Sequence, residues 1–479
     1  MRKHSYVTVT DQFCGAGGSS LGAVSVGAEI RLAINHWPRA IDTYSTNHPD
    51  AQVDCVDIQA CDPRRYPSTD ILITSPECTN HSLAKGRRRQ QQADLFGNIP
   101  DPSAVRSRMT MFSVCDFAEV HQYNAIIVEN VVDARDWVMW PAWLHAMDLL
   151  GYNHKSVYYN SMHAHPTPQS RDRMYVVFWR KGNHAPDLDL RPVAHCAKCG
   201  KDVQAVQTWK QTSKRYGRYR QQYLYRCPAC ASVVEPYYYC AASAIDWSLP
   251  CPRIGDRATP LKEKTLARIR VGLEKFGRQP LGVELGFAHA QNNRAFPLAD
   301  PMRTQTTRQT VGMVVPPFVA DMRSNNTPKG LGDPLSTMCA GGNHHALVVP
   351  YYSTGQAVTT DDPLPTITTV DRHALAVPPF IVGYYTRLAG IQAAVSGIDE
   401  ALPTQSTQPR HYLVQPGEVP AVEDCGFRML QPHEIQAAMA FPPEYVVTGT
   451  KREQVKQLGN AVTPPVMAEL LKRVMGSLM

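Results

Sequence analysis

The sequence predicts an α/β protein in which a parallel, doubly wound sheet is followed by a long, mainly β insertion and a short helical return. Short β-rich runs alternate with helical stretches from Tyr6 to about Trp179, a pattern typical of a parallel sheet covered by helices on both faces. After about Lys181 this alternation stops, and helical patterns return after about Phe427. We therefore expect three segments: 1–182, the insertion 183–425, and 426–479, which rejoins the first.

The strands of the first segment are expected where β-branched, aromatic and other apolar residues run together. A Gly-rich turn follows the first of these runs, as at the start of a strand-helix-strand unit. The expected strands are Tyr6–Thr10, Ile30–Ile34, Asp70–Ile73, Ala125–Val128 and Met174–Phe178.

Two helices are expected in the last segment. One starts at Gln431–Glu434 and the other at Pro464–Val466. The second has an apolar face with helical spacing, which predicts that it packs on another part of the protein. This face consists of Val466, Leu470, Leu471 and Val474.

The composition limits the class of protein. The chain has 479 residues and a formal net charge of +7, with 43% hydrophobic and 19% charged residues, a balance that excludes a fibrous or mainly disordered protein. No window approaches the roughly 18 consecutive apolar residues of a membrane span, and the N-terminus does not resemble a signal peptide. We expect a soluble, cytoplasmic protein with no membrane partner; the charge alone is weak evidence for a polyanionic partner.

The insertion contains an internal repeat from about residue 286 to 416. A motif of the form Asp-Pro-Leu-x-Thr, with Met for Leu in the first copy, starts at Asp300, Asp333 and Asp362, and more loosely at Glu400. A β-rich run ending in proline follows each copy, so each unit is expected to fold as strand, turn, strand. The repeat could be a structural β-array or could present its turns to an extended ligand.

A Gly-rich motif, Asp11–Gly22, follows the first expected strand directly. Glycines in such a turn let the backbone approach a ligand closely, and the helix that follows offers its free amide groups and its positive dipole end. A nucleotide-like cofactor therefore fits. The pattern alone does not distinguish nicotinamide, flavin and S-adenosylmethionine (SAM) enzymes.

Further motifs converge on the same edge of the predicted sheet. Cys78 lies just after the third expected strand, and Glu129 follows the fourth. Gln169, Arg171 and Arg173 alternate at the start of the fifth, so they are expected on one face of it. A cysteine at this place can be a buried structural thiol or a nucleophile, and the carboxylate and arginines nearby favour the nucleophile.

Together these motifs resemble those of cytosine-5 DNA methyltransferases, which are SAM-dependent enzymes. The similar segments are Asp11–Gly22, Ser75–Ser82, Glu129–Val131, Gln169–Arg173, Arg428–Glu434 and Gln457–Val462, in the family's order. The family places a variable target-recognition region between the fourth and the fifth, where this chain has its insertion. The resemblance implies an α/β, Rossmann-like class I methyltransferase domain with an inserted, mainly β target-recognition region.

The resemblance also implies the chemistry. Cys78 would add its thiolate to carbon 6 of a cytosine flipped out of the duplex, so that carbon 5 can attack the methyl group of SAM. Glu129 would hold or protonate ring nitrogen 3, and Arg173 with Arg171 would neutralise charge at the ring carbonyl oxygen. Loss of the carbon 5 proton and release of Cys78 would complete the transfer.

The same resemblance implies a SAM site at the Gly-rich motif. Trp37 would stack near the adenine, Asp57 would accept a hydrogen bond from its amino group, and Asn460 would close the pocket from the C-terminal side. The implied cofactor residues are Phe13, Gly15, Ala16, Gly17, Gly18, Trp37, Asp57, Ile58 and Asn460.

The chain departs from the family's pattern at two positions. Glu77 stands before Cys78 where the family usually has proline, and a carboxylate there disfavours the thiolate unless it points away or pairs with a cation. His36 stands where the family has the acid that binds the ribose hydroxyls. Neutral drift is one explanation for both departures. At Glu77 the alternative is altered chemistry, with a different flipped base or a different transferred group.

Two Cys-x-x-Cys pairs stand in the insertion, Cys196 with Cys199 and Cys227 with Cys230. In a reduced protein two such pairs indicate a structural zinc site with four thiolate ligands, here in a ribbon spanning about 193–240. The chain has 13 cysteines, and an odd number does not suggest a disulfide framework.

Basic and polar residues in several places are predicted to contact double-stranded DNA. They lie in the loop after Cys78, before the fifth strand, in the aromatic and basic hairpin between the cysteine pairs, and beside the Thr-rich turns of the repeat. The predicted contacts are Ser82, Lys85, Arg87, Arg88, Arg89, Gln169, Lys214, Arg215, Arg218, Arg308 and Arg372. The hairpin could equally be a solvated edge.

The sequence thus predicts a monomeric, sequence-specific DNA cytosine-5 methyltransferase in the cytoplasm of a bacterial or phage-infected cell. Its biological role could be restriction-modification, phage protection or regulation. The alternatives are an RNA cytosine-5 methyltransferase, a relative with altered chemistry at Glu77, and a catalytically silent DNA-binding scaffold. A nicotinamide oxidoreductase would leave Cys78 and the cysteine pairs unexplained.

Overall fold

The computed structural model describes both ends of the chain and short pieces of the region between them. The described residues are 6–76, 110–276, 281–284, 295–298, 300–304, 311–315, 318–321, 329–330, 345–348, 381–383, 395–396, 411–412 and 421–478. Among them, no helix is both long and apolar enough to span a membrane.

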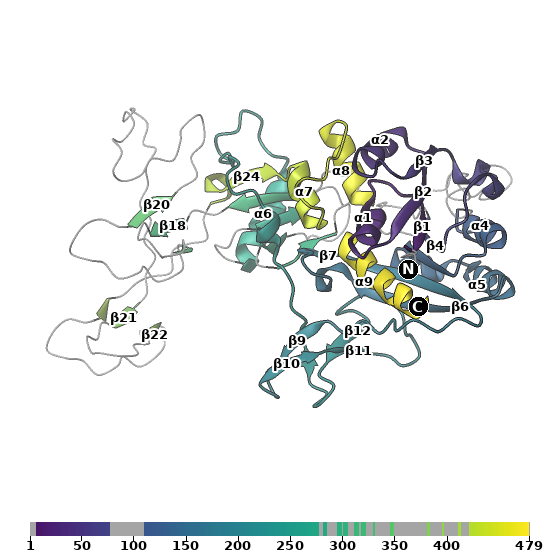
Figure 1. Cartoon of the computed structure of the whole chain (residues 1–479). Helices are drawn as coiled ribbons and strands as arrows, with labels where there is room; N and C mark the ends of the chain where they lie inside the picture. Colours follow the sequence, from purple (N-terminus) through teal and green to yellow (C-terminus); the bar gives the residue numbers. More distant parts are fainter. Residues whose placement is uncertain are drawn as a thin grey trace, which may run out of the picture.

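A seven-stranded sheet forms the centre of the N-terminal part (Figure 1), with the strand order β3-β2-β1-β4-β5-β8-β6. Neighbouring strands run parallel from β3 to β5, whereas β8 runs antiparallel to both β5 and β6. The strands are β1 (Thr8–Gln12), β2 (Glu29–Asn35), β3 (Gln52–Cys55), β4 (Ile71–Thr74), β5 (Ala125–Asn130), β6 (Tyr152–Asn160) and β8 (Asp172–Arg180).

The sheet differs from the sequence prediction in the direction of β8, beside the edge strand β6. The strand predicted at Met174–Phe178 is present as β8, but it is antiparallel, so the predicted all-parallel sheet is wrong here. The connection from β6 to β8 holds only a 3-10 turn, Ser161–His163, and the two-residue strand β7 (Gln169–Ser170). A parallel crossover usually needs a helix, and a connection without one favours antiparallel neighbours.

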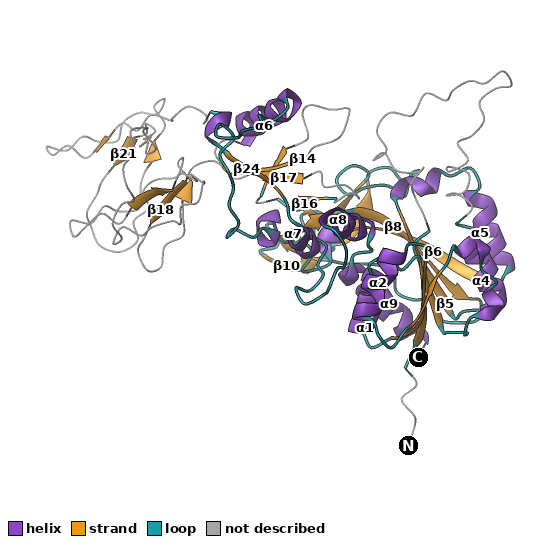
Figure 2. Ribbon diagram, turned by 90° about the horizontal axis from the view of Figure 1, so that it is seen from above, coloured by secondary structure: helices purple, strands orange, loops and turns teal. Residues whose placement is uncertain are grey.

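Helices cover both faces of the sheet (Figure 2). One layer consists of α1 (Gly18–Ser25), α2 (Pro38–Asn47) and α9 (Pro464–Leu478), and the other of α4 (Ser113–His121) and α5 (Trp140–Leu149). The alternation along β4 explains both layers, because Ile71 and Ile73 pack in the core under the first and Leu72 in the core under the second.

The C-terminal segment packs against the beginning of the chain. It contains β24 (Gly426–Met429), α7 (Pro432–Ala438) and α8 (Lys451–Asn460) before α9. The apolar face predicted for α9 is confirmed, because its four residues are fully buried against the sheet and α1. Between β24 and α7, Arg428 and Glu434 form an ion pair with 2.7 Å contacts, and Glu434 is fully buried.

The described part of the insertion consists mainly of small antiparallel sheets, and its strand β16 (Met302–Arg303) instead pairs in parallel with β7 of the N-terminal part. The ribbon that carries the two cysteine pairs has a hairpin of β9 (Val193–Cys196) and β10 (Lys201–Gln204), and a sheet of β11 (Val206–Trp209), β12 (Tyr223–Arg226) and β13 (Val233–Val234). Helix α6 (Glu263–Phe276) follows.

In the described residues of the repeat, three sheets share one topology, each with its first strand in the middle, antiparallel to the next two. Each of these units therefore has three strands. The first of them precedes the strand, turn and strand that the sequence predicts. The sheets are β14 (Leu281–Glu284), β15 (Ala295–Pro297) and β17 (Val311–Val315), with β24 beside β17; β18 (Phe318–Asp321), β19 (Lys329–Gly330) and β20 (His345–Val348); and β21 (Ile381–Gly383), β22 (Val395–Ser396) and β23 (His411–Tyr412). The predicted copy at Asp362 lies outside the described residues.

Candidate active site

The carboxyl ends of the parallel strands lie along one edge of the sheet and bring the sequence motifs together. Ser75, after β4, donates a hydrogen bond to the carbonyl oxygen of Phe13, after β1, at 3.4 Å. Asn130, at the end of β5, donates to the carbonyl oxygen of Pro76 at 3.3 Å. Glu77 and Cys78 lie outside the described residues, but the turn that leads to them is thus held beside Glu129 and Asn130.

Glu129 and Arg173 form an ion pair at this edge. Arg173 Nε lies 2.9 Å from Glu129 Oε1, and the side chains are only 11–14% exposed. Arg173 comes from β8, whose antiparallel pairing with β5 places Tyr175 opposite Glu129. A carboxylate and a guanidinium held together in a sheltered site can bind the polar edge and the carbonyl oxygen of a base.

Arg171 and Gln169 do not share a face with Arg173, contrary to the sequence prediction. Arg171 is buried and donates to the carbonyl oxygens of Gly459 and Ala461 at 3.2 and 3.1 Å, so it fixes the end of α8 instead of reaching the base. Gln169 is fully buried, and its side-chain nitrogen lies 3.3 Å from Met439 Sδ. The Gln169 side chain therefore faces the interior in this structure, and its contact with DNA remains a prediction.

The glycines of the Gly-rich motif serve two purposes. A Cβ added to Gly15, whose φ is +52°, would meet only the Phe13 carbonyl oxygen, at 3.8 Å, so the space beside Gly15 is open to a ligand. A Cβ on Gly18 would instead lie 2.1 Å from the carbonyl oxygen of Val462, and one on Gly17 would lie 2.4 Å from the hydroxyl of Tyr445. Gly17 and Gly18 are therefore needed for the close approach of the C-terminal segment.

A buried carboxylate stabilises the start of α1. Asp11 accepts hydrogen bonds from the hydroxyls of Ser19 and Ser20, both at 2.6 Å. Burial raises the pKa of Asp11 to about 6, although these hydrogen bonds oppose the shift. Ala16 is also buried, and its carbonyl oxygen accepts from the hydroxyl of Tyr445.

The remaining predicted cofactor residues surround the same edge. Trp37 is partly buried, and the Lys456 Nζ of α8 lies 4.1 Å from the centre of its ring. Asp57 begins a 3-10 turn by accepting from the amide of Gln59, Ile58 is buried, and Asn460 at the end of α8 is exposed. The open space at Gly15, the start of α1 and an accessible aromatic ring fit the methionine and adenine parts of SAM.

The four predicted metal ligands come together. The sulfur atoms of Cys196, Cys199, Cys227 and Cys230 all lie within 4.8 Å of one another. Cys196 and Cys230 are 3.5 Å apart and Cys199 and Cys227 3.8 Å, close to the ~3.8 Å that tetrahedral zinc with ~2.3 Å bonds to sulfur requires. Gly200, with φ +64°, closes the first turn by donating to the Cys196 carbonyl oxygen. The cluster could therefore bind zinc.

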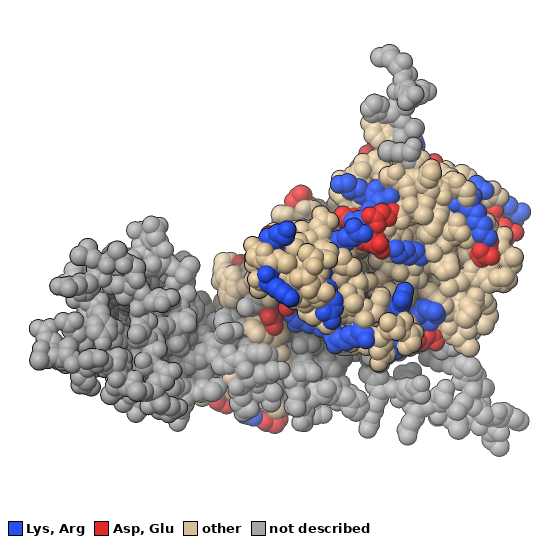
Figure 3. Space-filling model, turned by 90° about the horizontal axis from the view of Figure 1, so that it is seen from below, with Lys and Arg blue, Asp and Glu red and all other residues tan. Residues whose placement is uncertain are grey.

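The predicted DNA contacts of the ribbon divide into two kinds. Lys214 and Arg215 are exposed, whereas Arg218 is partly buried and makes two 2.7 Å contacts with Asp133. In this structure the guanidinium of Arg218 is therefore engaged by a carboxylate, and a contact of Arg218 with DNA remains a prediction. On the face in Figure 3, described Lys and Arg side chains lie among Asp and Glu. Ser82, Lys85, Arg87, Arg88, Arg89, Arg308 and Arg372 lie outside the described residues.

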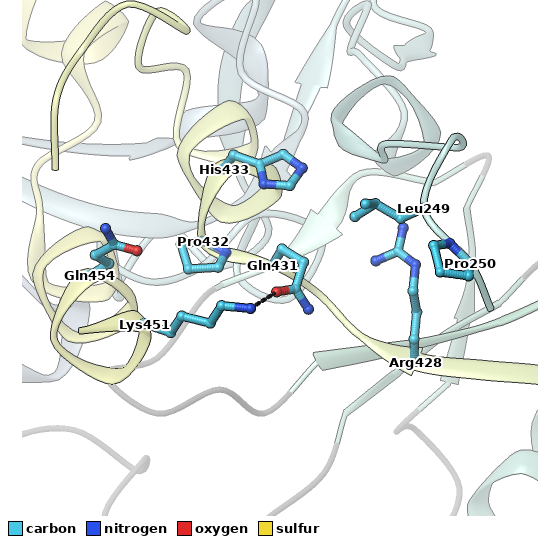
Figure 4. A pocket seen from close by; sticks show the side chains of 8 residues that line it. All are labelled: Leu249, Pro250, Arg428, Gln431, Pro432, His433, Lys451 and Gln454. Atoms are coloured by element: carbon cyan, nitrogen blue, oxygen red, sulfur yellow. Dashed lines mark hydrogen bonds between the residues drawn. The ribbon is translucent and has the colours of Figure 1, made fainter. Parts of the chain in front are cut away.

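A separate cleft of about 540 Å³ opens between the insertion and the C-terminal segment (Figure 4). Its lining residues include none of the predicted site residues, and Lys451 at its wall donates to Gln431. Arg428 at this cleft belongs to the buried ion pair with Glu434. The cleft is lined by Leu249, Pro250, Arg428, Gln431, Pro432, His433, Lys451 and Gln454.

Four residues that the sequence analysis did not select take part in the site. Asp133 and Asp172 receive hydrogen bonds from the ribbon, Lys456 lies beside Trp37, and Tyr445 reaches Ala16. Asp172 lies within the motif Gln169–Arg173 and Asp133 lies two residues after Glu129–Val131, so their place in the sequence was a usable signal. Tyr445 and Lys456 are brought to the site only by tertiary packing.

Comparison with known proteins identifies related chains. The family model described as C-5 cytosine-specific DNA methylase matches residues 7–216 and 359–476. Type II methyltransferase M.HgiDI of Herpetosiphon aurantiacus is 30% identical over 181 residues, 36% of this chain and 53% of that protein, so the match spans about half the relative's length. M.HgiGI of the same organism is 32% identical over 131 residues, 26% of this chain and 90% of that protein. A mutant of Spodoptera frugiperda DNMT2 is a solved structure that aligns with 98% of this chain and 99% of its own, at 13% identity and a TM-score of 0.47.

Proposed function

We propose that this chain, which belongs to the C-5 cytosine-specific DNA methylase family, transfers a methyl group from SAM to carbon 5 of cytosine at a specific sequence in double-stranded DNA. The observation that supports this most directly is the sheet edge where Glu129, Arg173 and the turn leading to Cys78 meet. These groups are the acid, the cation and the nucleophile that the reaction needs.

The chain's residues have distinct roles in the proposed reaction. The Cys78 thiolate forms a bond to carbon 6 of a flipped cytosine, which makes carbon 5 nucleophilic. Glu129 holds ring nitrogen 3 and Arg173 stabilises negative charge at the ring carbonyl oxygen, both in a site sheltered from water. Bound SAM supplies the methyl group that carbon 5 takes. Departure of the carbon 5 proton then allows the bond between Cys78 and carbon 6 to break.

The metal, the binding surface and the division of the chain belong to the same proposal. Zinc held by the four cysteines has a structural role, because all four ligand positions are protein sulfurs. Lys214 and Arg215 are exposed on the ribbon and available to phosphates, and the repeat supplies further recognition surface. The catalytic domain consists of 1–182 and 426–479, and the enzyme acts as a monomer in the cytoplasm of a bacterial or phage-infected cell.

The proposal is tested by incubating the protein with SAM and double-stranded DNA and analysing the nucleosides by mass spectrometry. Wild type should produce 5-methylcytosine, and Arg173→Gln should reduce its rate of formation on the order of 100-fold, the cost of losing a charge stabiliser. Arg180→Gln removes the same charge from the exposed end of the same strand and serves as the matched control.

Three outcomes would contradict the proposal. Methylation of RNA but not of DNA would favour the RNA alternative, and a different modified base would indicate altered chemistry at Glu77. Equal rates for the Arg173→Gln and Arg180→Gln variants would remove Arg173 from the active site.

A further inference from the structure

The loop between β11 and β12 of the ribbon rests on the segments that carry Glu129 and Arg173. We call Tyr216–Tyr219 of this loop the ribbon tip. Arg218 Nη2 lies 2.7 Å from both carboxylate oxygens of Asp133, and the amide of Tyr219 donates to Asp172 Oδ1 at 2.9 Å. The hydroxyl of Tyr216 donates to Asp136 at 2.9 Å.

The acids held by the ribbon tip are neighbours of the proposed catalytic pair. Asp133 lies in the 3-10 turn Val132–Asp136, directly after the β5 end that carries Glu129. Asp172 precedes Arg173, and its carbonyl oxygen accepts from Arg173 Nη1 at 2.8 Å. Arg218 and Tyr219 therefore each contact one of two backbone segments. The separation of these segments determines how Glu129 and Arg173 lie relative to each other.

The docking of the ribbon tip is well packed and is connected to the cysteine cluster. The Tyr219 side chain is buried, and its ring contacts the His163 ring edge to face, with the centres 4.8 Å apart. Gln207 of β11 donates to the Tyr158 carbonyl oxygen of β6 at 2.8 Å. Cys227 directly follows β12, so a metal bound by the four cysteines would fix the strand from which the tip extends.

We infer that the ribbon tip is a positioning element for the Glu129–Arg173 pair, acting through Asp133 and Asp172 and not through contact with DNA. This inference rests on the proposed function for its catalytic consequence. Rates of enzymatic reactions fall steeply when reacting groups are misplaced, by about 100-fold for a shift of about 1 Å. Release of either acid would free its segment to move by such an amount.

The test compares Arg218→Gln, Asp133→Asn and the double variant with Lys201→Gln. Lys201 is an exposed residue of β10 on the other hairpin of the ribbon, so this control matches the loss of positive charge in Arg218→Gln without altering the tip. We expect kcat to fall about 10- to 100-fold in both single variants. KM for DNA and the Kd for SAM should stay within about twofold of wild type, which a loss of phosphate contacts would not allow. The double variant should be no slower than the slower single variant, because both changes break one contact.

A second measurement does not depend on catalysis. Amide hydrogen exchange should become about tenfold faster in residues 129–136 and 172–173 of Arg218→Gln, with wild-type rates in α9 and in Lys201→Gln. Unchanged exchange in these residues would overturn the inference, and so would a raised KM for DNA with unchanged kcat, which would make Arg218 a DNA contact. If wild type transfers no methyl group, the proposed function fails, and the exchange pattern still decides whether the tip holds the two segments.

Discussion

The C-terminal segment and the ribbon both pack on the N-terminal sheet, but by different physical means. The C-terminal segment buries apolar residues of α9 and brings backbone into close contact with the glycines of α1. The ribbon docks through aromatic rings and a few charged contacts, of which Arg218 with Asp133 is the clearest. Burial of apolar area and close packing stabilise a fold, whereas directional contacts determine the relative position of groups.

Because of this difference, substitutions in the two regions should have different effects. Changes in the C-terminal segment should lower global stability, since its contacts are part of the core. Changes in the ribbon should alter the active site with a smaller loss of stability.

The largest effect on stability is expected from Glu434→Ala. The change leaves Arg428, which is 9% exposed, without its buried carboxylate, at a cost of about 3 to 5 kcal/mol. Glu469→Ala breaks a more exposed ion pair with Arg473 on α9 and should cost at most about 0.5 kcal/mol. Urea unfolding of both variants measures the difference, and similar midpoints would show that the buried pair is unimportant.

A smaller loss is expected from Gly22→Ala. The new Cβ would lie 2.4 Å from the Pro464 carbonyl oxygen and 3.0 Å from the Ala468 amide, so α9 must shift away from α1. Overpacking of this kind costs about 1 to 3 kcal/mol. Gly476→Ala is the matched control, because it adds the same methyl group to α9 where nothing lies within 4 Å. Equal unfolding free energies for the two variants would contradict the docking of α9 on α1.

Removal of metal should act mainly on the ribbon. After treatment with a chelator, hydrogen exchange should accelerate in β11 and β12, because these strands lie between the two cysteine pairs in the sequence, and remain slow in α9. The global unfolding midpoint should move less than in Glu434→Ala. A protein purified without bound metal, or a ribbon insensitive to the chelator, would contradict the zinc assignment.

The smallest effect is a dependence of stability on pH through Asp11. Because burial raises the pKa of Asp11 from 3.8 to about 6, the folded state binds its proton more tightly than the unfolded state. The stability contributed by Asp11 is therefore complete below about pH 4 and is lost as the pH rises through about 6. Wild type should lose about 1 kcal/mol relative to Asp11→Asn between pH 5 and pH 7. Parallel unfolding curves across this range would contradict the shift.

Features fixed by local sequence were predictable. Strands β1, β2, β4 and β5 were visible as apolar runs, whereas the short and partly polar β3 was not expected. The cysteine cluster followed from ligand spacing, and the buried face of α9 followed from helical periodicity. The Arg428–Glu434 pair also lies within one short motif.

Features fixed by long-range packing were not predictable. Arg171 was assigned to the base, but its partners are the carbonyl oxygens of Gly459 and Ala461, nearly 300 residues away in the chain. Arg218 resembles Lys214 and Arg215 in sequence, and only the fold shows that Asp133, 85 residues earlier, engages it. The direction of β8 depends on the connection that precedes it rather than on its own residues.

The proposed function requires that the chain methylate cytosine in DNA through Cys78. The most direct measurement is nucleoside mass spectrometry of DNA from cells that express wild type or Cys78→Ala. We expect 5-methylcytosine with wild type and none above background with Cys78→Ala. DNA without 5-methylcytosine in both, or equal amounts in both, would contradict it.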